Sequence, residues 1–193
     1  MQLRLARQAI GAVLLTTLSV LLPAWASEPA SVSDGGEQAA YLAGLKKLYL
    51  TGSERQALLK HCNSLLASYA LRAGYQVGQS ERRDLLYSLQ VDKAGALLVR
   101  EESRVPDSVE RSVRNQQVDV FGVDPFVRYE CPAGGIRCVL FNPVTRQPLL
   151  TIVRDLDGAA ELAKGLTFLI RNIQKGSSAR ASLFENARRL VVA

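Results

Sequence analysis

Histidine and cysteine are scarce in this chain of 193 residues, which contains one histidine and three cysteines. Structural zinc sites usually use four Cys or His ligands in closely spaced pairs, so no metal site is expected. A Ser-His-Asp triad could form only around His61. The chain also lacks the G-x-S-x-G motif of many hydrolases and the Gly-Lys-Ser/Thr ending of a phosphate-binding loop. The residues therefore identify neither a cofactor nor an enzyme class.

Long apolar runs are absent too, apart from one near the N-terminus. Residues 9–23 form an apolar stretch of 15 residues, preceded by Arg4 and Arg7 and followed by Ala24-Trp25-Ala26. A basic start, a short apolar run and a small-x-small ending are typical of a cleaved export signal. An uncleaved membrane anchor would need roughly 20 apolar residues. We expect residues 1–26 to be a signal peptide cleaved after Ala26, and the protein to be periplasmic.

No run of like charge marks the sequence. The 24 basic and 18 acidic residues are mixed along the chain, and the net charge of +6 falls to 22 − 18 = +4 without residues 1–26. This mild excess gives no reason to expect nucleic acid as a partner. Residues 27–36 are small, polar and turn-rich, which predicts a flexible leader. Residues 37–193 are long enough for a single domain with its own core.

Helical periodicity appears at both ends of the expected domain. Residues 37–50 and 54–73 each carry apolar side chains at helical spacing, and Gly52 and Ser53 between them suit the end of one helix and the cap of the next. These segments predict a helical hairpin. A third helical pattern starts after Gly158 and ends at Gly176, and a last helix follows Ser177 or Ser178.

The middle of the chain has the two-residue period of β-strands. Residues 84–91 and 96–102 predict a hairpin whose turn places Gly95 at a positive φ angle. Residues 103–117 are polar, with valines spaced for a short helix after Pro106. Further strands are expected at residues 117–123, 126–131, 137–142 and 148–155. Short links require antiparallel pairing. The predicted fold is α+β: the helical hairpin, an antiparallel sheet of five to six strands, and one or two C-terminal helices packed on it.

Cys131 and Cys138 bracket the turn PAGGI between two of these strands. A metal clasp lacks further ligands, and a redox pair usually has the Cys-x-x-Cys spacing at a helix N-terminus. If the two cysteines face each other across a hairpin, Tyr129 opposes Leu140, and the apolar side chains gather on one face of the sheet. Export would supply an oxidising compartment. We therefore predict a Cys131–Cys138 disulfide.

The next hairpin is expected to continue the same sheet. With its turn near Thr145, Leu140 faces Leu150 and Cys138 faces Ile152. Both faces of this hairpin are then largely apolar, which predicts a helix cover on each side, the C-terminal helix on one and the N-terminal helices on the other. Alternatively, one apolar face is left open for a partner.

His61 and Cys62 are the pair around which a catalytic site could be centred. Neighbouring residues on a helix point about 100° apart, so the two side chains do not aim at each other. Cys62 lies in an apolar stripe and is expected to be a core residue, although a disulfide to one hairpin cysteine is a further option. A hydrolase or thiol enzyme centred on His61 and Cys62 is the alternative function. A cleft holding His61 beside an acidic residue would favour it.

The first function hypothesis is therefore a small exported binding or accessory protein that contacts another envelope or secreted protein. An exposed apolar face or groove would favour it. A basic bias near the C-terminus suggests contact with an acidic partner or an anionic surface, and its residues are Arg171, Lys175, Arg180, Arg188 and Arg189. A solvated helix face would explain the same arginines and lysine.

Overall fold

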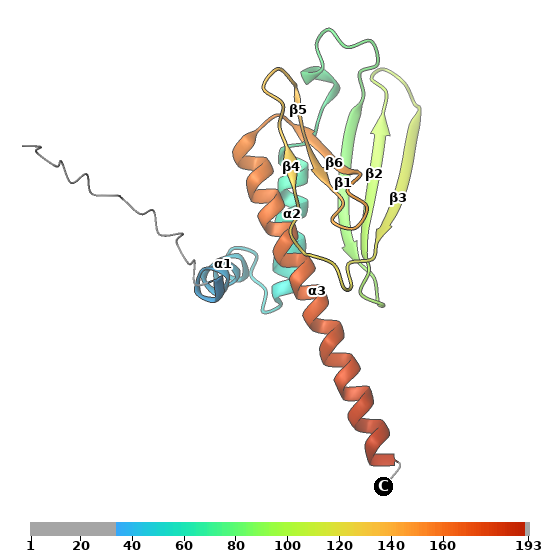
Figure 1. Cartoon of the computed structure of the whole chain (residues 1–193). Coiled ribbons are helices and arrows are strands. Elements are labelled where there is room, and N and C mark those ends of the chain that lie inside the picture. Colours follow the sequence, from blue (N-terminus) through green and yellow to red (C-terminus); the bar gives the residue numbers. More distant parts are fainter. Residues whose placement is uncertain (1–33, 192–193) are drawn as a thin grey trace, which may run out of the picture. The chain divides into compact units, whose positions relative to one another are not determined.

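In the computed structural model, three α-helices flank two small antiparallel sheets (Figure 1). The structure describes the backbone of residues 34–191 and the side chains of residues 36–176. The elements, in chain order, are α1 (Asp34–Leu48), α2 (Glu54–Ser68), the 3₁₀ turn η1 (Ala73–Tyr75), β1 (Asp84–Val91), β2 (Leu97–Arg104), β3 (Arg111–Val118), β4 (Tyr129–Glu130), β5 (Arg137–Phe141), β6 (Pro148–Val153) and α3 (Leu156–Val191). The α+β class and the N-terminal helix pair are confirmed.

The strands form two sheets, where one sheet was expected. The first sheet has the order β1-β2-β3 and the second has the order β4-β5-β6. Each contains only neighbours along the chain, because short links join the strands of each set. No strand lies among the described residues between β3 and β4, and these two strands do not pair with each other. The expectation of one continuous sheet is therefore wrong.

A short segment after α2 lies between the two sheets. The N–H of Val153 in β6 donates to the carbonyl of Tyr69, and the N–H of Leu85 in β1 donates to the carbonyl of Leu71, both at 2.9 Å. Isolated bridges pair Ala70 with Ile152 and Leu71 with Leu85. Residues 69–71 therefore act as a short strand that joins the inner edges of both sheets and satisfies their backbone groups.

Asn63 on α2 covers another part of the β1 edge. Its side-chain amide donates to the carbonyl of Leu89 at 3.0 Å and accepts from the N–H of Leu89 at 2.7 Å. An amide side chain carries the same donor and acceptor as a peptide group, so it replaces a neighbouring strand at this position.

Helices α2 and α3 run antiparallel and approach closely at two glycines. A Cβ at Gly165 would lie 3.1 Å from Sγ of Cys62, and one at Gly158 would lie 2.6 Å from Cζ of Tyr69. Because glycine has no side chain, the helices can pack at these points with the ring and the thiol filling the space. The largest buried side chains come from all layers and include Leu58, Leu66, Leu97, Leu140, Leu150, Ile152, Leu162, Leu166, Leu169, Ile170 and Ile173.

The predicted hairpin registers are confirmed. Tyr129 pairs with Leu140, and Cys138 and Leu140 pair with Ile152 and Leu150. Cys131 and Cys138 form a disulfide with their Cα atoms 4.2 Å apart. Gly95 has a φ of +98°, and the side chain of Ser53 accepts a hydrogen bond from the N–H of Gln56 at 3.3 Å, as the turn and cap patterns predicted.

Helix α3 packs on β4 and β5, as expected for one side of this sheet. The expected cover by the N-terminal helices on the other side is only partly correct. Helix α2 packs mainly on α3 and β1, and β6 contacts β1. None of the helices in the described residues is both long and apolar enough to cross a bilayer.

Several element boundaries differ from the predictions. β3 occupies Arg111–Val118, where a short helix and a later strand were expected, and the strand predicted at 126–131 is reduced to Tyr129–Glu130. Most β3 side chains are exposed, so the strand has no apolar alternation to reveal it.

The helix ends also differ. α1 begins at Asp34, inside the expected leader, and α2 ends at Ser68. α3 continues through Gly176 to Val191 as one helix, so the predicted division there is wrong. A glycine in a helix costs only about 1 kcal/mol relative to alanine, and flanking helix can outweigh that penalty.

We predict that Gly158→Ala destabilises the protein, because the new Cβ would lie 2.6 Å from Cζ of Tyr69. Overpacking of this kind costs about 1–3 kcal/mol. Chemical denaturation followed by circular dichroism measures the change. Gly44→Ala is the matched control, since a Cβ at that helical glycine would have no atom within 4 Å, and there alanine should raise the free energy of unfolding. Equal stability of the two variants would contradict the prediction.

Candidate functional site

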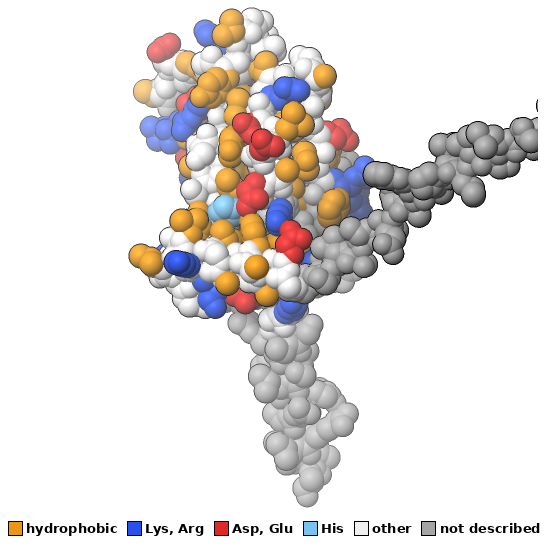
Figure 2. Space-filling model, turned by 90° about the vertical axis from the view of Figure 1, so that its left-hand side faces the viewer, with side chains coloured by type: hydrophobic (Ala, Val, Ile, Leu, Met, Phe, Trp, Pro, Cys, Tyr) orange, Lys and Arg blue, Asp and Glu red, His pale blue; other side chains and the backbone are white. Residues whose placement is uncertain are grey.

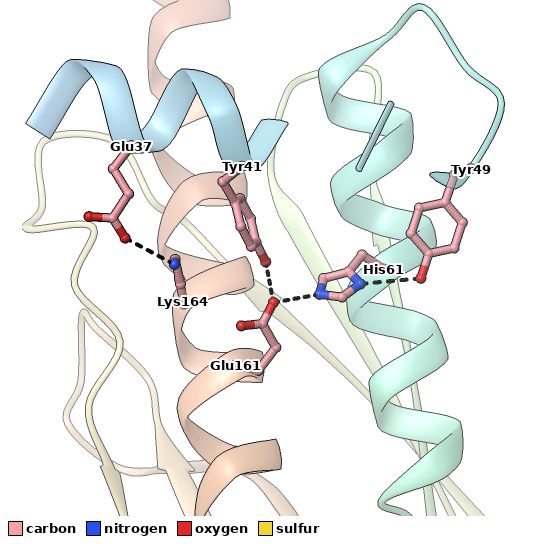
Figure 3. A network of polar contacts seen from close by, with 6 residues as sticks. All are labelled: Glu37, Tyr41, Tyr49, His61, Glu161 and Lys164. Carbon is pink, nitrogen blue, oxygen red and sulfur yellow. Dashed lines mark hydrogen bonds and ion pairs between the residues drawn. The ribbon is translucent and has the colours of Figure 1, made fainter. Parts of the chain in front are cut away.

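A polar cluster lies where the three helices meet (Figure 3). The Tyr41 hydroxyl of α1 donates to Oε1 of Glu161 on α3 at 2.7 Å, and Nε2 of His61 on α2 lies 2.9 Å from the same oxygen. The Tyr49 hydroxyl lies 3.2 Å from Nδ1 of His61. Each ring nitrogen of His61 thus has a hydrogen-bond partner, Glu161 at Nε2 and Tyr49 at Nδ1.

The cluster changes the acidity of two of its members. Burial alone would raise the pKa of Glu161, but hydrogen bonds from Tyr41 and His61 outweigh it and hold that pKa below its ordinary value of 4.5. Burial and the neighbouring Glu161 carboxylate raise the pKa of Tyr41. Glu161 is therefore an anion and Tyr41 a neutral donor at neutral pH, which is the combination that holds α1 against α3.

Lys164 extends the cluster along α3. Its Nζ lies 3.3 Å from Oε1 of Glu37 on α1 and 4.8 Å from the centre of the Tyr41 ring. Phe168, one turn further along α3, packs against the same ring with centroids 5.2 Å apart. The short helix α1 is thus fixed to α3 by an ion pair, a hydrogen bond and aromatic packing.

Cys62 lies in the core beside this cluster. Its side chain is fully buried, and it is the one free cysteine among the described residues. Burial, with a smaller contribution from the Glu161 carboxylate, raises the pKa of its thiol to about 12. A nucleophilic cysteine needs a lowered pKa and solvent access, so this thiol fits the expected core residue and not a nucleophile.

His61 does lie beside an acidic residue, which is one part of the arrangement that would favour the enzyme hypothesis. However, both of its ring nitrogens have hydrogen-bond partners, and only 12% of its side chain is exposed. A general base must reach a proton on the substrate. In this arrangement the His61 ring instead joins Tyr49 to Glu161. The contact between His61 and Glu161 therefore links α2 to α3.

A groove lies between α3 and the segment that leads into β4. Its volume is about 260 Å³. The walls are mainly apolar, and the lining residues are Phe126, Val127, Tyr129, Ala160, Ala163, Lys164, Thr167, Phe168 and Arg171. Neither His61 nor Glu161 lines it. We call it the α3 groove.

The walls of the α3 groove are held in place by specific contacts. The N–H of Val127 donates to the Thr167 hydroxyl at 3.1 Å, which fastens the segment to α3. That hydroxyl in turn donates to the Ala163 carbonyl at 2.8 Å. Phe126 and Tyr129 are nevertheless 58% and 38% exposed. The groove therefore presents aromatic surface to solvent on a fixed backbone.

Two basic side chains stand on the α3 wall of the groove. Arg171 lies over the Phe168 ring, 5.8 Å from its centre, and hydrogen-bonds Gln38 at 3.5 Å. Lys164 is the second. Of the basic residues proposed from the sequence, Arg171 thus lines the groove and Lys175 is exposed. The side chains of Arg180, Arg188 and Arg189 lie outside the described residues.

On the face shown in Figure 2, hydrophobic, basic and acidic side chains of the described residues are intermingled. Among the described side chains, no group of three or more His, Cys, Asp or Glu is placed to hold a metal ion.

Comparison of the chain with protein-family models, with curated proteins and with solved structures found no match. The candidate site therefore has to be argued from its geometry. Sequence reasoning did not find the α3 groove. Phe126 and Phe168 are far apart in the chain, and each alone looks like an ordinary apolar residue of its element.

We predict that Glu161→Gln reduces the pH dependence of stability. The folded pKa of Glu161 lies below its ordinary value of 4.5, so the unfolded chain binds the proton more tightly. The stabilisation is therefore present above about pH 4.5 and is lost as the pH falls through the folded pKa.

Urea denaturation at several pH values between 7 and 3 measures this effect. The variant should be less stable than the wild type at pH 7 and should lose less stability on acidification. Glu110→Gln, at an exposed carboxylate outside the cluster, is the matched control. Parallel curves for the wild type and Glu161→Gln would show that Glu161 does not contribute.

Proposed function

We propose that this protein is exported to the periplasm and acts there as a binding protein. In this proposal the α3 groove holds an apolar segment of another envelope or secreted protein, and acidic side chains that flank this segment lie near Lys164 and Arg171. The observation that carries the proposal is the exposed aromatic surface of Phe126 and Tyr129 beside these two cations.

The chemistry of the groove supports a peptide-like ligand. Exposed aromatic side chains contribute large contact area, and aromatic residues and arginine are enriched at the energetic centres of protein interfaces. The Val127–Thr167 hydrogen bond and the nearby Cys131–Cys138 disulfide keep the wall in one conformation. A preformed wall loses little conformational entropy when a ligand binds, which favours affinity.

Export is supported by two independent features. The first is the basic, apolar and small-x-small pattern of residues 1–26. The second is the disulfide, because such bonds persist in oxidising compartments and are rare in the cytosol.

The rival proposal, a hydrolase or thiol enzyme at His61 and Cys62, has one supporting observation, the contact between His61 and Glu161. The buried thiol and the two occupied ring nitrogens of His61 count against it. We therefore prefer the binding function.

A single mass-spectrometric measurement tests export and the rival enzyme together. Protein recovered from the periplasm, alkylated under native conditions and then after unfolding, should begin at Ser27. Cys131 and Cys138 should remain linked, and Cys62 should react only after unfolding, because its thiol is buried and has a pKa of about 12. Retention of residues 1–26 would count against export, and rapid alkylation of native Cys62 would favour the rival enzyme over the binding function.

Selection from a library of random octapeptides tests the binding function. Peptides that bind the purified protein should be enriched in large apolar and acidic residues. For a selected peptide, Phe126→Ser should raise the Kd by about thirtyfold or more, the effect of losing an interface hot spot. Val109→Ser is the matched control, because Val109 is 99% exposed and lies outside the groove. The proposal fails if no peptide binds, or if binding survives Phe126→Ser.

A further inference from the structure

In the segment that leads through β4, successive residues alternate in the direction of their backbone groups. One residue turns its N–H and C=O toward β5, and the next turns them away from it. The N–H of Phe141 in β5 donates to the carbonyl of Arg128 at 2.9 Å, so this pair is a hydrogen-bonded one. The Cα atoms of Cys131 and Cys138 are 4.2 Å apart, the short separation of a non-hydrogen-bonded pair. The alternation therefore directs the N–H and C=O groups of Tyr129 and Cys131 away from β5.

These outward groups lie on a free edge. β4 is the outermost strand of its sheet, and no strand of the described residues pairs with its other side. One end of the edge is closed, since the N–H of Val127 is bonded to Thr167 on α3. The groups at Tyr129 and Cys131 remain as a template for one more strand.

A hollow lies on each face of this edge. Val127 and Tyr129 line the α3 groove, whereas Arg128 and Glu130 line a second hollow of about 330 Å³ together with Phe141 and Arg146. This division follows from strand geometry, because successive side chains point to opposite faces. We call the second one the arginine hollow.

Arg146 is held in position by its turn. The buried side chain of Asn142 accepts hydrogen bonds from the N–H groups of Val144 at 2.8 Å and Thr145 at 3.2 Å. The N–H of Arg146 donates to the Asn142 carbonyl at 2.9 Å. Arg146 adopts a φ of +62°, a value that non-glycine residues seldom have. The hydrogen bonds of the turn therefore set the backbone position of this arginine.

The arginine hollow has an excess of positive charge. Arg128 and Arg146 are exposed, and in the described part of the chain neither forms an ion pair, whereas Arg104 and Arg114 are paired with glutamates. Glu130 is the one acidic residue that lines the hollow. Guanidinium groups bind carboxylates with paired hydrogen bonds, so acidic side chains are the complementary ligand.

We propose that the partner segment binds as an added β-strand on the edge formed by Tyr129 and Cys131. Its apolar side chains enter the α3 groove, and its alternate, acidic side chains contact Arg128 and Arg146 in the arginine hollow. The inference rests on the proposed function and specifies its ligand: an extended peptide with a two-residue alternation of apolar and acidic residues. Strand addition of this type takes affinity from backbone bonds and specificity from alternate pockets.

Octapeptides selected against the purified protein provide the probe. They should show apolar and acidic residues alternating with a period of two. The double variant Arg128→Glu/Arg146→Glu should raise the Kd of a selected peptide at least about tenfold, as expected for loss of charged hydrogen bonds. Selection against this variant should favour basic residues at the formerly acidic positions. Methylation of every second backbone nitrogen removes the N–H groups along one edge of the peptide. It should abolish binding when the methylated edge is the one that faces β4, and not when it is the opposite edge.

Lys47→Glu/Arg82→Glu changes the net charge equally at exposed positions outside both hollows and is the matched control. The strand-addition proposal is overturned if selected peptides have a spacing of three to four residues, or if the arginine variant weakens binding no more than the control does. If either of these results is found and Phe126→Ser still abolishes binding, the groove binds the peptide, and only its binding as an added strand is wrong. If no peptide binds the wild type, both proposals fail.

Discussion

Two backbone hydrogen bonds link the sheets through one short segment: Val153 donates to Tyr69, and Leu85 donates to Leu71. This segment continues directly from α2, so the position of α2 relative to both sheets follows from these bonds. The Tyr69 ring then lies against Gly158 and determines where α3 begins to pack. α3 in turn supplies one wall of the α3 groove. The proposed binding surface therefore depends on backbone pairing by a segment that is distant from it in the chain.

The polar cluster at the helix junction has a different role from the groove. His61, Tyr41 and Glu161 satisfy one another's hydrogen bonds in a partly buried position, where an unpaired polar group would be costly. Their contacts fix α1, which otherwise contributes few buried side chains, against the longer helices. The α3 groove and the arginine hollow, by contrast, present aromatic and cationic groups on the two faces of the β4 edge. A satisfied cluster stabilises a fold, whereas an exposed one suits a partner.

Much of the local structure could be predicted, because short-range chemistry decides it. The pairing of Tyr129 with Leu140 follows from sorting apolar side chains onto one face around the two cysteines, and Ser53 and Gly95 act at a cap and a turn that need their residue types. β3 could not be predicted in this way. Its side chains are mostly polar on both faces, and its extent is set by pairing with β2.

The sequence by itself determined the α+β class, the disulfide and the hairpin registers, since these depend on periodicity and on residues close together in the chain. Only the tertiary structure decided that the strands divide into two sheets, that Glu161 reaches His61, and that Phe126 and Phe168 line one groove. Each of these contacts joins residues from distant parts of the chain. Such contacts depend on how the layers pack, and no local pattern of side chains records that packing.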